Sequence, residues 1–284
     1  MVKFLKYFFQ SVIIYLFFLI ARILGIKLSR IVFSSLFTTI GPLFKSKKVI
    51  IKNLEILKSY IPNINKKIII ENMWSNYGMT FSEYVFLKQL RANNKISIKG
   101  KEYLDEIIKD GKPVIFVSGH FANFELMSME ITKRNVQLAT IYRPLNNIFL
   151  NPFMEFLRKK YICSNQIKKG LKGVREAIEF LKKDFSIALM IDQRVSEGEK
   201  INFFGREALT TTLPAQLSMK FNLKIVPVFL ERTKFNDFII EFYRPIDSKN
   251  FKNKIELTKK LNNTLENMII NNPNQWIWTH NRWK

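Results

Sequence analysis

The sequence predicts an α/β protein: an open, largely parallel central sheet flanked by helices, preceded by an apolar N-terminal helix that anchors the chain in a membrane. Two features predict the sheet. From residue 96 onward, short β-branched runs alternate with stretches of helical length in a mostly β-α-β order, which is typical of parallel strands covered by helices. Residues 114–117 form a continuous apolar run, as expected of a strand that is buried on both faces of such a sheet.

The N-terminal stretch predicts the anchor. Residues 7–21 carry no charge, and Lys6 and Arg22 flank them. At about 1.5 Å per residue this run covers about 22 Å, so it spans a hydrocarbon core of about 30 Å only if the flanking cations snorkel toward the headgroups. It lacks the small-x-small cleavage site of a secretory signal. We therefore expect residues 1–26 to be an uncleaved membrane anchor, with an interfacial helix as the alternative, and residues 27–284 to form the folded domain.

The rest of the chain divides into helices and strands in order. Residues 31–44 are a second apolar stretch, expected to lie on the membrane or against the domain, and residues 45–61 and 66–91 are expected to be amphipathic helices. The expected strands are residues 96–98, 114–117, 136–142, 187–191, 225–230 and 238–243. The expected later helices are residues 101–109, 124–134, 148–161, 171–184, 212–221 and 255–270.

The chain is strongly basic, since 46 Lys and Arg residues against 23 Asp and Glu residues give a net charge of +23. Such an excess suits a polyanionic partner, namely nucleic acid, an anionic membrane surface or an acidic substrate. Lysine enrichment from an AT-rich genome is the alternative, although it does not explain why acidic residues are so few. With one cysteine and two histidines, the chain has no internal disulfide and no Cys- or His-rich metal site, and Cys163 is expected to be a structural thiol.

The strongest candidate for chemistry is His120 together with Glu125. His120 follows the buried strand at residues 114–117, Asn123 is placed to cap the next helix, and Glu125 lies in its first turn. At such a corner the imidazole can swing over the helix start, so that Glu125 accepts a hydrogen bond from one ring nitrogen and leaves the other free as a base. A loop histidine beside a helix-capping glutamate is the alternative, because this spacing alone is a weak signal.

Other polar residues follow other expected strands. Arg143 comes directly after one strand, and the run Asp192-Gln193-Arg194 comes after another. Open α/β sheets bind ligands at the carboxyl ends of their strands, so these residues and His120 are expected to meet in one site. The guanidinium of Arg143 suits a phosphate or a developing oxyanion, with a salt bridge at the rim as the alternative. Asp192 with Arg194 is equally compatible with a structural ion pair.

Several motifs follow one another along the chain. They are His120-Phe121-Ala122-Asn123-Phe124-Glu125, Tyr142-Arg143-Pro144 with Asn146-Asn147, Asp192-Gln193-Arg194, Phe203-Phe204-Gly205 with Thr210 to Ala215, and the C-terminal Gln275-Trp276-x-Trp278-x-His280-x-Arg282-Trp283-Lys284. Their wording and order resemble the lipid A late acyltransferases, the lauroyl and myristoyl acyltransferases, over roughly the whole chain. The first motif also resembles the His-x-x-x-x-Asp/Glu motif of glycerolipid-type acyltransferases, in which aspartate is the commoner carboxylate.

The resemblance implies a glycerolipid-acyltransferase-like catalytic domain at residues 27–284. It implies transfer of a fatty acyl chain from acyl carrier protein to a hydroxyl of a phosphorylated lipid A precursor, at the cytoplasmic face of a bacterial inner membrane. A thioester is already activated, so no metal or organic cofactor is expected. The acidic carrier protein, the anionic membrane and the phosphorylated acceptor would all be attracted to a chain of charge +23. The implied catalytic residues are His120 and Glu125, and the implied substrate-binding residues are Arg143, Asn123, Asn146, Asp192, Gln193 and Arg194.

The C-terminal tryptophans have two interpretations. Trp276, Trp278 and Trp283 alternate with polar residues, which suits either a membrane interface or an ordinary edge strand. In both cases His280 is expected to be structural rather than catalytic.

Three other functions remain as alternatives. A sibling acyltransferase could act on another phosphoglycolipid, such as a phosphatidylinositol mannoside, whereas the Phe-Pro-Glu-Gly-Thr-Arg signature of glycerol-phosphate acyltransferases is absent. A nucleic-acid binder would use the same charge, but the lysines are spread along the chain and no RNP, zinc-finger or KH signature occurs. A serine hydrolase would need a G-x-S-x-G elbow, which the chain lacks.

Overall fold

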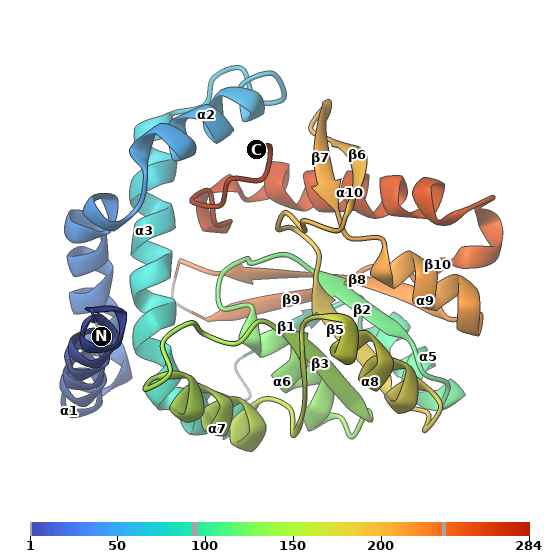
Figure 1. The fold of residues 1–284 in the computed structure, drawn as a ribbon, viewed down its shortest axis with the longest axis horizontal. Helices are drawn as coiled ribbons and strands as arrows, with labels where there is room; N and C mark the ends of the chain where they lie inside the picture. The colour runs from blue at the N-terminus through green and yellow to red at the C-terminus, as the bar shows by residue number, and fades with distance from the viewer. Residues whose placement is uncertain (1, 93–95, 235–236) are drawn as a thin grey trace.

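A computed structural model describes residues 2–92, 96–234 and 237–284. Its centre is a sheet in the order β1-β9-β8-β2-β5-β3-β4, with β10 also paired to β8 (Figure 1). Five of the strand pairs are parallel, and β8 pairs antiparallel with both β9 and β10. The predicted α/β fold with a largely parallel sheet is therefore confirmed. The strands of this sheet are β1 (Ile96–Lys99), β2 (Ile115–Ser118), β3 (Leu138–Tyr142), β4 (Asn165–Lys168), β5 (Ser186–Met190), β8 (Lys224–Arg232), β9 (Phe238–Phe242) and β10 (Ile246–Asp247).

Helices cover both faces of the sheet because β-α-β connections are right-handed and the chain reverses its direction across the sheet after β4. Figure 1 shows α8 and α9 on the near face of the sheet and α6 on the far face. The helices that flank the sheet are α5 (Lys101–Asp110), α6 (Glu125–Lys133), α7 (Asn151–Tyr161), α8 (Leu171–Leu181), α9 (Leu213–Phe221) and α10 (Lys254–Asn271).

The predicted buried strand is β2, which lies between β5 and β8. Every residue of β2 is buried, and Ile115 and Phe116 are completely inaccessible to solvent. An alternating strand would expose one face, so the continuous apolar run reflects burial under helices on both sides. The loop that carries His120 follows this strand directly.

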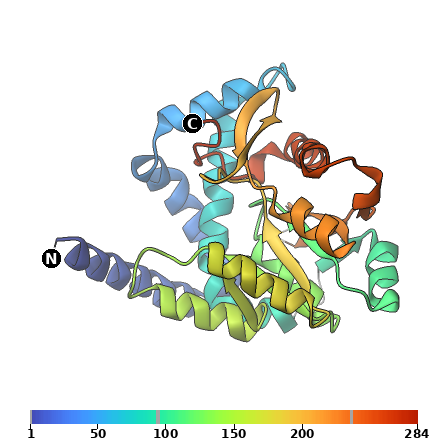
Figure 2. The same ribbon diagram turned by 45° about the vertical axis from the view of Figure 1, so that its right-hand side comes forward.

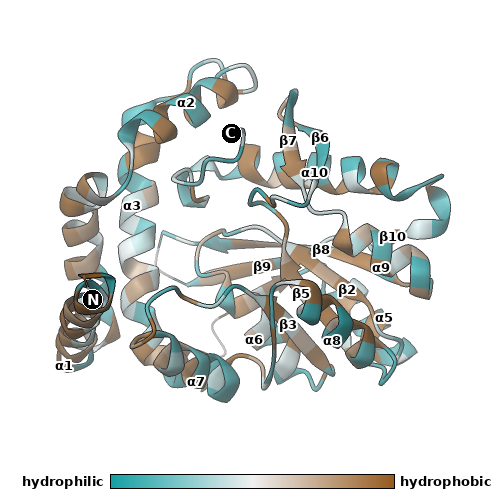
Figure 3. Cartoon of the chain, viewed as in Figure 1, coloured by the Kyte–Doolittle hydropathy of each residue, from teal (hydrophilic) through white to brown (hydrophobic). Residues whose placement is uncertain are grey.

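Two helical layers stand beside the sheet. α1 (Val2–Phe44) packs against α3 (Lys66–Glu83), and α3 separates it from the sheet (Figures 1 and 2). The apolar colour of α1 in Figure 3 matches its composition, and by length and composition Val2–Leu43 can cross a membrane. α1 breaks at Gly25, whose φ of 71° is a left-handed value that favours glycine. Beyond the break, Phe33 is buried against Phe81 of α3, so residues 26–44 lie against the domain.

The structure differs from the expectations at three places. The expected helix at residues 66–91 is α3, a 3₁₀ turn (Tyr84–Phe86) and α4 (Leu87–Ala92), and α2 (Lys47–Leu57) precedes it. The polar sequence of the edge strand β4 does not alternate, because only Ile167 is buried, so β4 was not predicted. Phe204 and Gly205 of the Phe203-Phe204-Gly205 motif form the turn between β6 (Glu199–Phe203) and β7 (Arg206–Thr210), a separate hairpin whose strands were not predicted.

Candidate active site

The register of the sheet brings His120 to Asp192. Strands β2 and β5 are parallel, with Ser118 paired to Met190, so the residues two positions beyond each of them lie side by side. The imidazole Nδ1 of His120 lies 2.8 Å from Asp192 Oδ1, and the backbone N–H of His120 donates to Oδ2 at 2.8 Å. A carboxylate at Nδ1 places the proton on that nitrogen and leaves Nε2 as the basic one.

Electrostatics support this assignment. Burial disfavours the imidazolium, but the charge and hydrogen bond of Asp192, with a further effect of the Glu125 charge, raise the pKa of His120 above its ordinary value. Burial by itself would raise the pKa of Asp192, but the adjacent His120 and the hydrogen bonds from His120 and Trp276 lower it. Asp192 is therefore an ionised partner that stabilises His120 once the imidazole has taken a proton.

The C-terminal tail supplies the remaining donor to this carboxylate. The indole N–H of Trp276 donates to Asp192 Oδ2 at 2.9 Å, and the neighbouring Trp278 donates instead to Pro273 O at 2.7 Å. Both indoles are 1% exposed, so the prediction that these two tryptophans lie at a membrane interface is wrong. The tail forms no strand either. A single bridge joins Trp276 to Phe121, which follows His120 directly.

Trp276→Phe should lower turnover about tenfold or more, since a hydrogen bond to a charged group is worth about 1.5–3 kcal/mol. The ring stays in place, but Asp192 loses a donor that holds Oδ2. Trp278→Phe is the matched control, because it removes the same N–H from a backbone carbonyl instead of the carboxylate. Steady-state kinetics and thermal unfolding should show similar stability losses and a turnover loss in the Trp276 variant alone. Equal turnover losses in the two variants would contradict this role.

Glu125 is not the residue that binds Nδ1 of His120, in contrast to the predicted hydrogen bond. Its carboxylate accepts from Tyr84 Oη at 2.7 Å and from Arg158 Nε at 2.8 Å, and Arg158 Nη2 lies 2.7 Å away. The physical reason is the sheet register, which puts Asp192 at the imidazole and turns Glu125 toward α7. Glu125 still acts on His120 through its charge, whereas the charge of Arg158 opposes it.

Arg158 was missed by sequence reasoning because it is one of three consecutive basic residues at the end of an amphipathic helix. Its guanidinium lies over the Tyr142 ring at 5.5 Å, and its Nη1 is buried with no hydrogen-bond partner in the described part of the chain. A buried N–H without a partner is costly. An oxygen of a bound ligand would satisfy it.

The loop that follows His120 is held from behind by α3. Ala122 has a φ of 44°, which is strained for a residue with a Cβ, and its carbonyl accepts from Thr80 Oγ1 at 3.1 Å. Asn123 is buried and donates to Glu83 Oε2 at 2.8 Å. It thus faces the interior of the protein, and its predicted contact with substrate has no support in this geometry. Four bonds that complete this support are Asn76 Nδ2 to Ala122 O, Arg232 Nη2 to Glu83 Oε2, Arg30 Nε to Glu83 Oε1 and Ala122 N to Gln275 O.

Glu83 is thus the centre of a buried ion cluster that links α1, α3 and β8 to the His120 loop. Burial would raise the pKa of Glu83, but the charges of Arg232 and then Arg30, and the hydrogen bonds, lower it. The carboxylate is therefore ionised and fully paired, which suits a buried charge that fixes a loop.

Arg143 lies on the exposed surface at the carboxyl end of β3. Among residues 2–92, 96–234 and 237–284 it forms no ion pair, so the alternative of a rim salt bridge finds no partner there. The backbone N–H of Lys169, which follows β4, donates a hydrogen bond to Tyr142 O at 2.8 Å. Burial and then the positive charge of the nearby Arg143 lower the pKa of Lys169, whereas the charge of Glu197 opposes the shift. Asn146 is exposed in the same loop.

More polar groups surround Asp192. Gln193 Nε2 lies 3.5 Å from His120 Nδ1, and Arg194 has a buried Nε without a partner among the described residues. Arg282 is fully buried and donates to Leu209 O and Thr210 Oγ1 at 2.7 Å each. Burial lowers the pKa of Arg282 to about 10, although the nearby charge of Asp192 opposes the shift. Burial likewise lowers the pKa of His280, so at neutral pH this second imidazole is an uncharged neighbour of the site.

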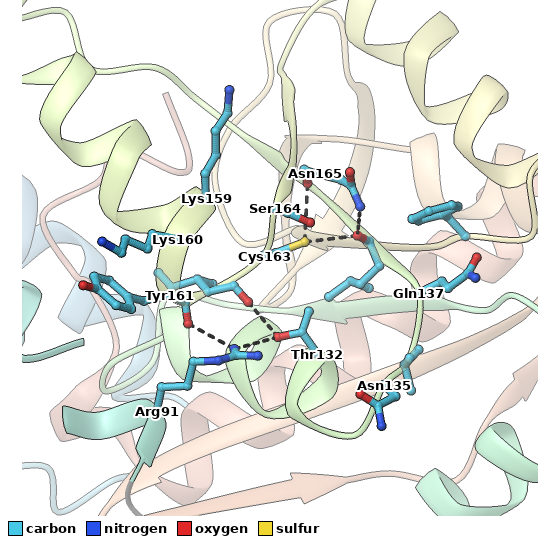
Figure 4. Close-up of a pocket in the computed structure, with 14 residues that line it drawn as sticks. Arg91, Thr132, Asn135, Gln137, Lys159, Lys160, Tyr161, Cys163, Ser164 and Asn165 are labelled. Carbon is cyan, nitrogen blue, oxygen red and sulfur yellow. Dashed lines mark hydrogen bonds between the residues drawn. The ribbon is translucent and has the colours of Figure 1, made fainter. Parts of the chain in front are cut away.

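An open cleft lies at the opposite end of the strands, near the amino ends of β3 and β4 (Figure 4). It has a volume of about 610 Å³, and Arg91, Thr132, Lys159 and Cys163 are among the residues that line it. In Figure 4, Arg91 is bonded to Thr132, and the thiol of Cys163 donates to Leu138 O at 3.1 Å. Burial raises the pKa of this thiol, and none of the described residues that line the cleft is a histidine or a carboxylate. The described residues also hold no cluster of metal-ligand type.

Comparison with known proteins gives a consistent result. The family model for the bacterial lipid A biosynthesis acyltransferases matches residues 1–284. The chain is 23% identical over 242 residues to a lipid A biosynthesis acyltransferase of Haemophilus influenzae, which covers 82% of this chain and 76% of that protein. It is 21% identical over 224 residues to lipid A biosynthesis acyltransferase 2 of Shigella flexneri, covering 75% of this chain and 69% of that one.

A solved structure is also similar. The 1-acyl-sn-glycerophosphate acyltransferase PlsC of Thermotoga maritima aligns with a TM-score of 0.42 and 15% identity, over 89% of this chain and 100% of that one. The match of the family model over the whole chain shows what the motifs resembled: the protein belongs to the family of bacterial lipid A biosynthesis acyltransferases.

Proposed function

We propose that this acyltransferase transfers a fatty acyl chain from acyl carrier protein to a hydroxyl of a lipid A precursor, with His120 as general base. The observation that carries the proposal is the His120–Asp192 pair. Its Nδ1 is held at 2.8 Å by an ionised carboxylate, and its Nε2 has no hydrogen-bond partner in the described part of the chain. This is the arrangement needed to take a proton from a hydroxyl.

The step balances with the groups present. His120 Nε2 takes the proton of the acceptor hydroxyl, whose oxygen attacks the thioester carbonyl carbon. The carbon–sulfur bond then breaks, and the thiolate of the carrier's arm takes this proton from the imidazolium and leaves as a thiol. Asp192 stabilises the imidazolium between these events, and backbone N–H groups at the start of α6 are proposed to bind the oxyanion.

Glu125 and Arg158 are proposed to act together. Because Glu125 pairs with Arg158, the carboxylate holds the guanidinium in place, and the free Nη1 of Arg158 is available for an oxygen of the substrate. The catalytic role implied for Glu125 thus becomes one of positioning and charge. Gln193 and Arg194, which follow Asp192 in the chain, are proposed to add further polar groups to the site.

Arg143 is proposed to bind a phosphate of the acceptor. It is an exposed cation beside a second cation, Lys169, at the carboxyl edge where the His120 loop also lies. Two neighbouring cations suit a dianionic group, and a guanidinium can bind phosphate with two parallel hydrogen bonds. Asn146 in the same loop is a further candidate donor to the sugar or phosphate. The same basic edge is proposed to attract the acidic carrier protein and the anionic cytoplasmic leaflet of the inner membrane.

Arg143→Lys should raise the Michaelis constant for the glycolipid by about tenfold, one lost hydrogen bond to a charged group, with little change in turnover at saturation. Lysine keeps the positive charge but lacks the two parallel N–H donors of the guanidinium. The measurement is steady-state kinetics in which the acceptor and the acyl donor are varied separately. A fall in turnover with an unchanged acceptor constant would instead assign Arg143 to the oxyanion, and a change confined to the donor constant would contradict both roles.

Mass spectrometry of lipid A tests the function as a whole. A strain that lacks the protein should make lipid A with one acyl chain missing, and the wild-type gene should restore it, whereas a gene carrying His120→Ala should not. The mass difference identifies the chain, and fragmentation identifies its hydroxyl. Unchanged lipid A together with an altered second phosphoglycolipid would favour the sibling acyltransferase instead.

A further inference from the structure

The first half of α1 packs lengthwise on the rest of the protein. The ring of Phe4 contacts Phe149 with centroids 5.0 Å apart, and Tyr15 and Phe18 contact Phe153 at 5.5 Å and 5.9 Å. The hydroxyl of Tyr15 also donates to the carbonyl of Phe149 at 2.8 Å. At about 1.5 Å per residue, the helix rises about 21 Å from Phe4 to Phe18 without leaving this surface. Figure 2 shows the inner end of this helix above α7, with its N-terminal end projecting beyond α7.

This packing differs from that of a helix that crosses a bilayer. A crossing helix leaves its domain on one side of a hydrocarbon core about 30 Å thick, whereas this helix touches the domain over most of that length. At Gly25 the chain turns back, with Ser29 Oγ bonded to Ala21 O at 2.7 Å, and Arg30 ends in the buried ion cluster of Glu83. Both ends of the first half therefore stay close to the catalytic domain.

We propose that α1 does not cross the membrane, and that its first half and a strip of the catalytic domain beside it enter one leaflet of an anionic bilayer. The strip consists of Leu145, Ile148 and Phe156, which are exposed although they are large and apolar. Ile148 and Phe156 are 56% and 53% exposed. Ile148 adjoins Phe149, and Phe156 lies one turn beyond Phe153 on α7, so the strip continues the surface that α1 covers.

The charges beside the strip match anionic lipid. Lys160 lies over the Phe156 ring at 5.2 Å, its chain neighbour Lys159 is exposed, and the exposed Arg143 and Lys6 lie two residues from Leu145 and Phe4 in the chain. Apolar side chains flanked by cations are typical of helices that lie in a headgroup region, and each cation near an anionic surface contributes about 1 kcal/mol. A lipid surface is favoured over a protein partner because the strip is continuous with an apolar helix. This inference does not depend on the acyl transfer proposed above.

The first arm of the test is topology, measured on the full chain in vesicles of phosphatidylglycerol and phosphatidylethanolamine. Lys3→Cys places a thiol at the start of α1, and Ile108→Cys places one on α5, far from the strip. Cys163 is buried, so the unsubstituted protein is the blank. A membrane-impermeant maleimide should label the same fraction of both variants, because both thiols face the same side. Complementary fractions, with Lys3→Cys reactive only in the vesicles where Ile108→Cys is protected, would overturn the proposal.

The second arm is depth. Ile148→Cys and Phe156→Cys, labelled with a fluorophore, should be quenched several-fold more by spin-labelled lipid than labelled Ile108→Cys, a control that is itself apolar and 42% exposed. Replacing phosphatidylglycerol by phosphatidylcholine should weaken quenching at residue 156, beside Lys160. Quenching at residues 148 and 156 no stronger than at residue 108 would refute the strip, and quenching that ignores lipid charge would refute its anionic preference. Neither arm measures activity, so each can fail while the proposed function holds.

Discussion

His120→Ala is expected to lower turnover by about 10²- to 10⁴-fold, the usual contribution of a positioned general base, while the protein still folds. His120 lies in the loop after β2, which backbone and side-chain hydrogen bonds hold on either side. Removing the ring therefore breaks the contacts with Asp192 Oδ1 and Phe124 but leaves the backbone hydrogen bond to Asp192 Oδ2. Single-turnover kinetics at saturating substrate measure the effect directly.

Circular dichroism and thermal unfolding are the controls for that variant. His280→Ala provides a comparison within the same protein, because the charge of Asp192 acts on His280 although these two described residues share no hydrogen bond. The turnover of this variant should fall much less than that of His120→Ala. Full activity in a folded His120→Ala protein would refute the general-base mechanism. An equal loss in both histidine variants would assign the effect to the shape of the site rather than to the base.

Asp192→Asn is expected to reduce turnover by a similar factor of about 10² to 10⁴, because a neutral amide no longer stabilises the imidazolium and can hold the ring in the wrong tautomer. Its pH dependence is the sharper test. The base must be neutral to act, and the pKa of His120 is raised, so in the wild type the acid limb of kcat/KM should lie above the ordinary imidazole value of about 6.5. The variant loses the carboxylate that raises this pKa and keeps the burial that lowers it, so the limb should move to lower pH.

Glu125→Gln is the matched control for this shift. It also removes one negative charge near His120, but Asp192 contributes both a larger charge effect and the hydrogen bond. The acid limb of the kcat/KM profile should therefore move less in Glu125→Gln than in Asp192→Asn. A larger shift in Glu125→Gln would restore the arrangement predicted from the sequence, with Glu125 as the partner of the imidazole. The full profile of kcat/KM between about pH 5 and 9 distinguishes these outcomes.

Local patterns in the sequence predicted much of the fold. The all-apolar run of β2, the β-α-β order after residue 96 and the apolar length of α1 are all encoded in neighbouring residues, because burial on both faces, helical period and membrane affinity each depend on side chains close in the chain. The position of His120 at the carboxyl end of a strand, the best physical argument for a site, follows from the same short-range pattern. The order of the motifs was sufficient to indicate the family.

Only the tertiary structure decided which residues touch. Asp192 reaches His120 because β5 lies beside β2 in a register that pairs Ser118 with Met190, and strand order is a property of the whole sheet that no local period encodes. For the same reason Glu125, five residues away in sequence, turns to Arg158, while Trp276, at the far end of the chain, donates to the Asp192 carboxylate. The sequence by itself determined most of the elements and the position of His120. Long-range packing determined the partners, because a hydrogen bond depends on distance in space and not on distance along the chain.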